Sequence, residues 1–133
     1  MKLYQQLDLI SRKLRQLEQK NDKKELSAAK LTVLQMIKLH NPSTLKELAN
    51  QQNVALPTMS KIVEDLHKRS LIIRAQSKED ARQRWIVPTQ KGIQLLTKAE
   101  TENELFWKQK VANLSNKELN QLTQSLDTLL KVL

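Results

Sequence analysis

The order of short elements between residues 43 and 92 constrains the fold of this chain more than any other feature of its sequence. Two short amphipathic helices come first, and the second of them begins at Pro57. Two apolar strands follow over residues 71–75 and 84–87, joined by a turn with the charged sequence QSKEDARQ. Because the apolar period changes from that of a helix to that of a strand, this segment predicts a helix-turn-helix followed by a β-hairpin.

Side-chain patterns define the ends and faces of these two helices. Thr44 and Glu47 have the spacing of a capping box, so the first of these two short helices begins at Thr44. Leu48 of this helix faces inward. The turn over residues 50–55 includes Val54, which we expect in the core. The inward face of the second helix carries Met59, Ile62, Val63 and Leu66. Its outward face carries Pro57, Lys61, Glu64 and Lys68.

Helices with narrow leucine seams begin and end the chain. The first helix, over residues 2–20, carries Leu3, Leu7, Ile10, Leu14 and Leu17 at heptad spacing. A capping box at Ser115 opens the last helix, whose seam is Leu119, Leu122, Leu126, Leu129 and Leu133. Such seams pack either against each other within one chain or between two chains. Because the middle of the chain already forms a compact unit, we expect the terminal helices to hold an intertwined homodimer.

The other apolar patterns complete a single protomer with three parts. A helix over residues 27–39 has a broad apolar surface that suits a buried position, and a long helix runs over residues 89–112. We expect an N-terminal dimerisation helix over residues 1–26, a winged helix-turn-helix over 27–92 and C-terminal dimerisation helices over 93–133. The predicted fold class is mainly α with a small β-hairpin wing, an α+β arrangement.

The charge of the chain favours a polyanionic partner. The formal net charge is +9; residues 1–24 and 41–92 each contribute +4, whereas residues 93–133 are neutral. A basic excess strengthens affinity for phosphate, although the same charge also serves solubility. The chain has no cysteine, and its two histidines lie in different elements without ligand spacing around them. We therefore expect no disulfide, no metal site and no cofactor.

Several spaced motifs resemble those of a known family. Thr89 follows Asp80 by nine residues, Arg82 lies between them, and Gly92 comes three residues after the threonine. Upstream lie Ser70-Leu71-Ile72-Ile73-Arg74, Leu48-Ala49 and the helix start Pro57-Thr58-Met59-Ser60. With this joint spacing, the chain resembles the MarR family of winged helix-turn-helix transcription regulators. The flanking helices also fit the family's order, so the resemblance covers nearly the whole chain.

The chain departs from the family pattern at three places. Ser70 stands where the family usually has glycine, and a left-handed conformation there costs a non-glycine residue about 1 kcal/mol. Pro88 replaces the usual leucine near the end of the second strand. Ala55 and Leu56 stand where a capping serine or threonine is expected, a loss of about 1 kcal/mol. None of these changes removes an expected DNA-contacting group.

The resemblance implies a recognition helix in the major groove of duplex DNA, with the hairpin as a wing beside it. We expect the DNA contacts to come from Thr44, Thr58, Ser60, Lys61, Glu64, Lys68, Arg74, Lys78, Arg82 and Arg84. Lys61 is the strongest candidate for a base or phosphate contact, and the resemblance implies that Arg82 reaches the minor groove. Asp80 is expected to stabilise the wing through an ion pair with Arg82 or Arg74.

A homodimer would present two recognition helices to successive major grooves about 34 Å apart. This geometry predicts a pseudo-palindromic operator, and repression is its usual consequence. Members of the resembled family often release DNA when a small aromatic ligand binds between the dimer helices and the DNA-binding lobes. Tyr4, Phe106 and Trp107 are candidates to line such a pocket, although aromatic residues at helical spacing are more often part of a core.

Other functions stay open at this point. A ligand-independent architectural regulator that prefers A·T-rich DNA would have the same sequence features. A helical protein-interaction module without DNA binding is a further alternative, and a membrane-surface helix is disfavoured by the narrow seam. With no nucleophile–base pair and a single glycine, the chain is not expected to be an enzyme. Because it has no signal peptide and no apolar run of about 18 residues, we expect a cytoplasmic protein without membrane contact.

Overall fold

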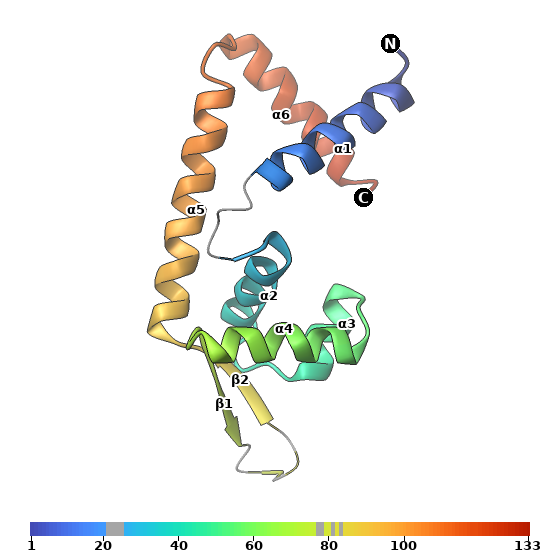
Figure 1. Cartoon of the computed structure of the whole chain (residues 1–133). Helices are drawn as coiled ribbons and strands as arrows, with labels where there is room; N and C mark the ends of the chain where they lie inside the picture. The colour runs from blue at the N-terminus through green and yellow to red at the C-terminus, as the bar shows by residue number, and fades with distance from the viewer. Residues whose placement is uncertain (21–25, 77–78, 81, 83) are drawn as a thin grey trace. The chain divides into compact units, whose positions relative to one another are not determined.

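The computed structural model describes residues 1–20, 26–76, 79–80, 82 and 84–133. Its elements in chain order are α1 (Leu3–Lys20), α2 (Ala28–Leu39), α3 (Leu45–Gln52), α4 (Leu56–Lys68), β1 (Ile72–Gln76), β2 (Arg84–Pro88), α5 (Gln90–Lys110) and α6 (Asn116–Leu130) (Figure 1). The predicted fold class, mainly α with a small β-hairpin, is confirmed. The chain divides within α5 into two compact units, Met1–Leu96 and Thr97–Leu133.

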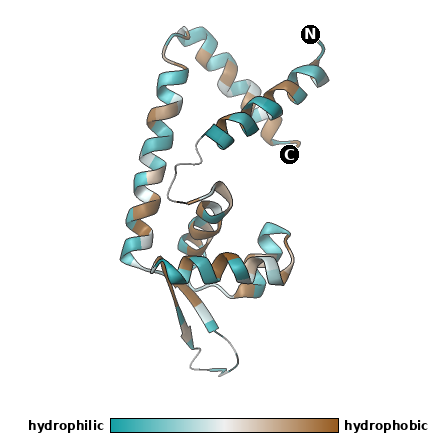
Figure 2. Ribbon diagram, viewed as in Figure 1, coloured by the Kyte–Doolittle hydropathy of each residue, from teal (hydrophilic) through white to brown (hydrophobic). Residues whose placement is uncertain are grey.

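The core of the first unit forms around α2, which is largely apolar along its length (Figure 2). Leu34 and Ile37 of α2, Leu48 of α3, and Met59 and Leu66 of α4 are fully buried. α3, α4 and β2 each contact α2, and α3 also packs against α4. Because burying one such side chain contributes about 1.5–3 kcal/mol, this cluster fixes α3 and α4 relative to α2.

Caps and a tight turn set the geometry between α3 and α4. Thr44 Oγ1 accepts a hydrogen bond from Glu47 N at 3.2 Å, which is one half of the predicted capping box. Asn53 ends α3 in the left-handed conformation with a φ of 52°. Because the backbone reverses there and does not continue the apolar face of α3, Val54 is 37% exposed, and its predicted burial is wrong. Ala55 precedes α4 without a side-chain cap, as the sequence predicts.

The segment that precedes α3 forms a bridge to Ile86, the middle residue of β2. β1 and β2 are antiparallel, with Arg74 opposite Ile86. On the other edge of β2, Ser43 N donates to Ile86 O at 3.1 Å and Ile86 N donates to Ser43 O at 2.7 Å. Ser43 is buried, and its hydroxyl donates to His40 O. Since Ser43 directly precedes the Thr44 cap, this bridge ties the hairpin to the start of α3.

The junction of α4, β1 and α5 explains the special residues of this region. Ser70 has a φ of 61°, the left-handed conformation that glycine adopts more readily. Its carbonyl oxygen accepts a hydrogen bond from Thr89 Oγ1 at 2.7 Å. A Cβ on Gly92 would lie 2.2 Å from Leu71 O, so this position requires glycine. Pro88 is the last residue of β2, so the hairpin forms in spite of this departure.

The second unit comprises the end of α5 and all of α6. Ser115 and Glu118 form the predicted capping box in full, with a hydrogen bond of 3.1 Å in each direction. No residue of α6 is fully buried within the single chain, and the same holds for α1 in the first unit. Among the described helices, none is long and apolar enough to cross a membrane.

Candidate nucleic-acid interface

The buried face of α4 determines which residues this helix displays. Met59, Val63 and Leu66 are buried. Because successive residues turn by about 100°, the positions halfway round the helix face outward. Of the predicted contact residues on α4, one is half-buried, Ser60, and four are exposed, namely Thr58, Lys61, Glu64 and Lys68. α4 therefore presents the polar, partly basic face that the sequence predicts.

Two of the outward residues of α4 pair with each other. Lys68 Nζ lies 3.6 Å from Glu64 Oε1 across one helical turn, and both side chains are more than half exposed. Such a pair stabilises a helix by only about 0.3–0.5 kcal/mol, and its two charges offset each other. In the part of the chain that the structure describes, no carboxylate pairs with Lys61. Lys61 is therefore an uncompensated positive charge on the outer face of α4.

Asp65 anchors the C-terminal end of α4 through a network that sequence reasoning missed. Its Oδ2 atom lies 3.0 Å from Lys30 Nζ on α2 and 2.9 Å from Arg69 Nε. The hydrogen bond from Lys30 holds the pKa of Asp65 below its ordinary value; partial burial opposes this shift, and the charges of Lys30 and Arg69 add to it. Lys91 Nζ also donates to Arg69 O at 3.1 Å. These contacts tie the end of α4 to both α2 and α5.

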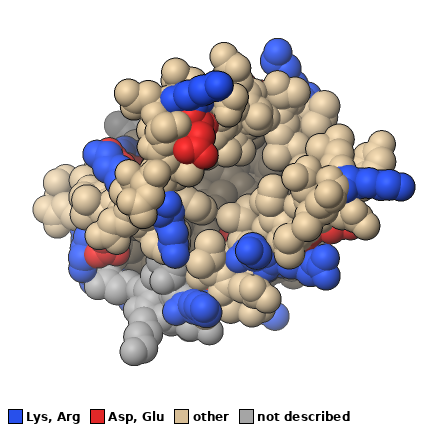
Figure 3. Space-filling view, turned by 90° about the horizontal axis from the view of Figure 1, so that it is seen from above, with Lys and Arg blue, Asp and Glu red and all other residues tan. Residues whose placement is uncertain are grey.

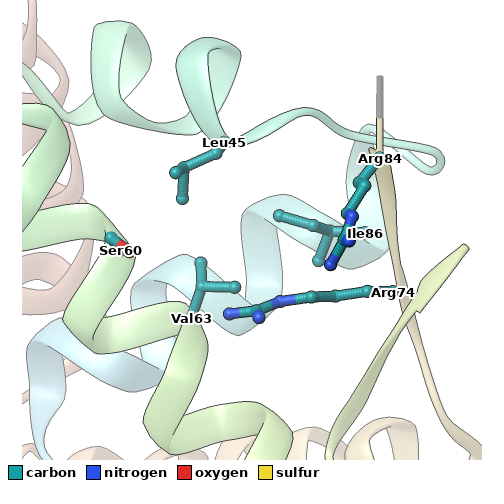
Figure 4. A pocket seen from close by; sticks show the side chains of 6 residues that line it. All are labelled: Leu45, Ser60, Val63, Arg74, Arg84 and Ile86. Carbon is teal, nitrogen blue, oxygen red and sulfur yellow. The ribbon is translucent and has the colours of Figure 1, made fainter. Parts of the chain in front are cut away.

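Arg74 and Arg84 share one face of the hairpin. Because Arg74 of β1 opposes Ile86, two residues along β2 from Arg84, the two arginines are diagonal neighbours on the same side. Both side chains extend over an open groove of about 190 Å³ (Figure 4). Its lining residues come from α3, α4 and the hairpin: Leu45, Ser60, Val63, Arg74, Arg84 and Ile86. The structure thus brings together Ser60 and two arginines that are remote from it in sequence.

The other predicted wing residues belong to the turn between the strands. Asp80 Oδ1 accepts a hydrogen bond from Arg82 N at 2.9 Å. Such side-chain-to-backbone bonds are typical of Asx turns, so Asp80 has a means of ordering the backbone at Arg82. Its ion pair with an arginine side chain stays a prediction, and Lys78 lies outside the described residues. Thr44 is half-buried at the start of α3, where its hydroxyl oxygen caps that helix.

Basic side chains are scattered over one face of the molecule. On the face shown in Figure 3, lysine and arginine side chains are dispersed among neutral ones, and acidic side chains accompany some of them. Proteins that bind DNA through particular contacts need a few well-placed cations rather than a uniformly basic surface.

The residues predicted for dimerisation remain accessible in the single chain. On α1, Leu3, Ile10 and Leu14 are 62%, 50% and 43% exposed, and Leu7 is half-buried. On α6, Leu122 and Leu126 are exposed, whereas Leu119 and Leu129 are half-buried. Both seams keep apolar surface that a second copy of the chain could cover.

The three aromatic residues predicted for a ligand pocket belong to different units. Phe106 and Trp107 of α5 stack edge-to-face with ring centroids 5.1 Å apart, and Lys110 Nζ lies 5.4 Å from the centroid of the Phe106 ring. Tyr4 of α1 is exposed, and so is Trp107, whereas Phe106 is half-buried. Within the single chain, Tyr4 and Trp107 therefore keep accessible ring surface, and the ligand pocket stays a prediction.

The region that holds α2, α3, α4 and the hairpin matches a known sequence family. The model of the MarR family matches residues 26–83. Over these residues, which make up α2, α3, α4 and the first strand of the hairpin, the chain is similar to the MarR family. The match begins at Leu26, just before α2, and reaches the turn of the hairpin. No curated protein matches the sequence.

Solved structures of MarR-family regulators have the same fold. MepR, a transcription regulator of the Staphylococcus aureus multidrug efflux pump MepA, is 21% identical with a TM-score of 0.85, over 99% of this chain and 98% of that one. A MarR family protein from Bacillus stearothermophilus is 18% identical with a TM-score of 0.83, over 97% and 91% of the two chains. Streptococcus pneumoniae FabT in complex with DNA is 16% identical with a TM-score of 0.80, over 97% and 96%.

Proposed function

We propose that this protein is a member of the MarR family, a sequence-specific regulator that binds duplex DNA as a homodimer and represses transcription. One observation carries the proposal: α4 is anchored by three buried residues and displays Lys61, which pairs with no carboxylate among the described residues, beside a hairpin that bears Arg74 and Arg84. A helix with one fixed face and a basic free face can enter the major groove. The DNA complex of FabT, whose fold this chain shares, adds support.

The proposed contacts follow from where each side chain lies. Lys61, together with Thr58 and Ser60, faces the base edges or phosphates from the N-terminal half of α4. Glu64 and Lys68 lie further along the same helix, where their mutual pairing moderates non-specific attraction. Arg82, at the turn of the hairpin, inserts into the minor groove, where narrow A·T-rich segments concentrate negative potential. Thr44, Arg74, Lys78 and Arg84 complete the interface, and Asp80 orders the turn.

Dimerisation is proposed from the open seams of α1 and α6. Two copies would cover the exposed leucines of α1 and α6 and form one body from residues 1–26 and 93–133, with residues 27–92 as the DNA-binding part of each protomer. Two copies of α4 about 34 Å apart would then select a pseudo-palindromic operator. A small aromatic ligand that stacks on Tyr4, Phe106 or Trp107 would release the DNA.

Selection from random duplex DNA at about 150 mM salt tests this proposal, because specific complexes survive salt that weakens phosphate contacts. A two-fold-related motif with half-sites one helical turn apart is the expected result. An A·T-rich enrichment without symmetry would assign the architectural role instead, and no enrichment from folded protein would favour the protein-interaction module.

Arg82 provides a sharper test within the selected operator. Arg82→Ala should weaken operator binding by about 1–3 kcal/mol, because a groove contact to bases is lost. Lys117→Gln on α6 is the matched control, since it removes one positive charge from a helix assigned to dimerisation. Fluorescence anisotropy of labelled operator measures both variants. Equal affinity of Arg82→Ala and Lys117→Gln would remove Arg82 from the interface.

A further inference from the structure

The groove between α4 and the hairpin has the composition of a phosphate site. Arg74 and Arg84 extend over it from the hairpin, and Ser60 faces it from α4 (Figure 4). Among the described residues, no carboxylate pairs with either guanidinium. Two neighbouring positive charges without a counter-ion produce a positive potential that attracts an anion, and guanidinium groups match the geometry of phosphate oxygens.

We propose that this groove holds one phosphodiester of the DNA backbone, with Arg74 and Arg84 as its cationic ligands and Ser60 Oγ as a third donor. The assignment rests on the proposed DNA binding and gives these residues a role distinct from that of Lys61. They position the protein on the duplex and do not read its sequence. Each protomer has one such groove, so a dimer engages two phosphates through it.

The floor of the groove distinguishes a DNA backbone from a free anion. Leu45, Val63 and Ile86 line it with apolar side chains. A free phosphate has no apolar part to bury there, whereas each phosphodiester carries a deoxyribose on both sides. The position of Ser60 also fits a DNA phosphate, because α4 would then contact the DNA backbone through Ser60, one residue before the outward-facing Lys61. Of the two sources of phosphate, the groove therefore fits the nucleic-acid backbone.

Salt titration of DNA binding tests the proposal with defined variants. The logarithm of the binding constant falls against the logarithm of salt concentration with a slope of about −0.9 per phosphate neutralised. In Arg74→Gln/Arg84→Gln, the slope should become shallower by about 0.9 per groove, or about 2 per dimer. Affinity at a fixed salt concentration should fall about tenfold or more. Since both side chains are exposed, the double variant should fold, which circular dichroism confirms or denies.

Two matched comparisons separate a phosphate contact from other roles. The double variant should lose equal factors on selected operator and on random duplex, so that the specificity ratio stays constant, whereas Lys61→Gln should lower that ratio. Arg74→Lys/Arg84→Lys keeps the charge and should restore the slope. If wild-type protein binds duplex DNA and the double variant keeps the slope of Lys117→Gln, the groove proposal is wrong while the proposed function stands. If folded wild-type protein binds no duplex, both are wrong.

Inorganic phosphate tests whether the groove binds a free anion instead of a DNA phosphodiester. Titration of inorganic phosphate, followed by NMR of the arginine side chains, should give only weak shifts that saturate above millimolar concentration. Tight saturation at Arg74 and Arg84, together with an unchanged DNA salt slope in the double variant, would assign the groove to a free anion and overturn the backbone assignment.

Discussion

Replacing Ser70 with glycine should stabilise the protein. The φ of 61° at Ser70 lies in the left-handed region, where an L side chain costs about 1–2 kcal/mol. Glycine avoids this cost but loses about 0.5–1 kcal/mol more conformational free energy on folding. The difference predicts that Ser70→Gly raises the free energy of unfolding by about 0.5–1 kcal/mol.

The surroundings of Ser70 offer no opposing contribution. Its backbone N–H donates to His67 O at 3.0 Å, and its carbonyl accepts from Thr89 Oγ1 at 2.7 Å. Glycine keeps both of these backbone groups. The side chain is exposed, and its hydroxyl makes no hydrogen bond to a described residue. Removing the side chain therefore sacrifices no contact that the structure describes.

Urea unfolding followed by circular dichroism measures this change, at one fixed protein concentration because an oligomer's stability depends on concentration. Ser70→Ala is the matched control. It loses the same hydroxyl but keeps the Cβ, so its unfolding midpoint should stay close to that of the wild type. A Ser70→Gly protein no more stable than Ser70→Ala would refute the reasoning, because the Cβ is what distinguishes the two.

Three further substitutions test other parts of the structure. The pKa of Asp65 is lowered from its ordinary value of 3.8, so the ionised carboxylate stabilises the fold above pH 3.8, and this contribution is lost as the pH falls through the lowered pKa. Asp65→Asn removes the contribution. Urea unfolding across pH should therefore show the variant less stable at neutral pH and equal to the wild type in strong acid; a constant gap would contradict this. Gly92→Ala should lower the free energy of unfolding by about 1–3 kcal/mol, because the added Cβ would lie 2.2 Å from Leu71 O. A lower midpoint in thermal unfolding would report this loss. Gln94→Ala, at an exposed site on the same helix, should be neutral. Leu126→Glu, at a seam position 48% exposed in the single chain, should leave helicity intact and yield monomers in sedimentation; a dimer would exclude this seam from the interface.

Features that arise within a few residues were predictable from the sequence. The capping box of Ser115 and Glu118 spans three residues, so its pattern was sufficient. The 3.6-residue period of α4 predicted the burial of Met59, Val63 and Leu66 and, with it, the exposure of the opposite face. The change from a helical to a strand-like apolar period likewise located the hairpin, whose strands lie within one residue of the prediction.

Features that join distant segments were not predictable in the same way. Asp65 pairs with Lys30 only because α2 and α4 pack together. The groove depends on the hairpin register, which sets Arg74 and Arg84 on the side that faces Ser60. Val54 shows the limit of apolar patterns in turns: its side chain follows the left-handed reversal at Asn53 rather than its own hydrophobicity.

The bridge between Ser43 and Ile86 has a consequence for how this region tolerates change. Ser43 must exchange two backbone hydrogen bonds with Ile86, while the next residue, Thr44, must cap α3. Because the bridge to Ile86 and the cap of α3 are made by adjacent residues, no residue separates the attachment to β2 from the start of the helix. The side chains just before Ser43 are exposed, but inserting a single residue between Ser43 and Thr44 would separate the β-bridge from the helix cap and force one of the two to break. The length of this segment is therefore more tightly constrained than the identity of its exposed side chains.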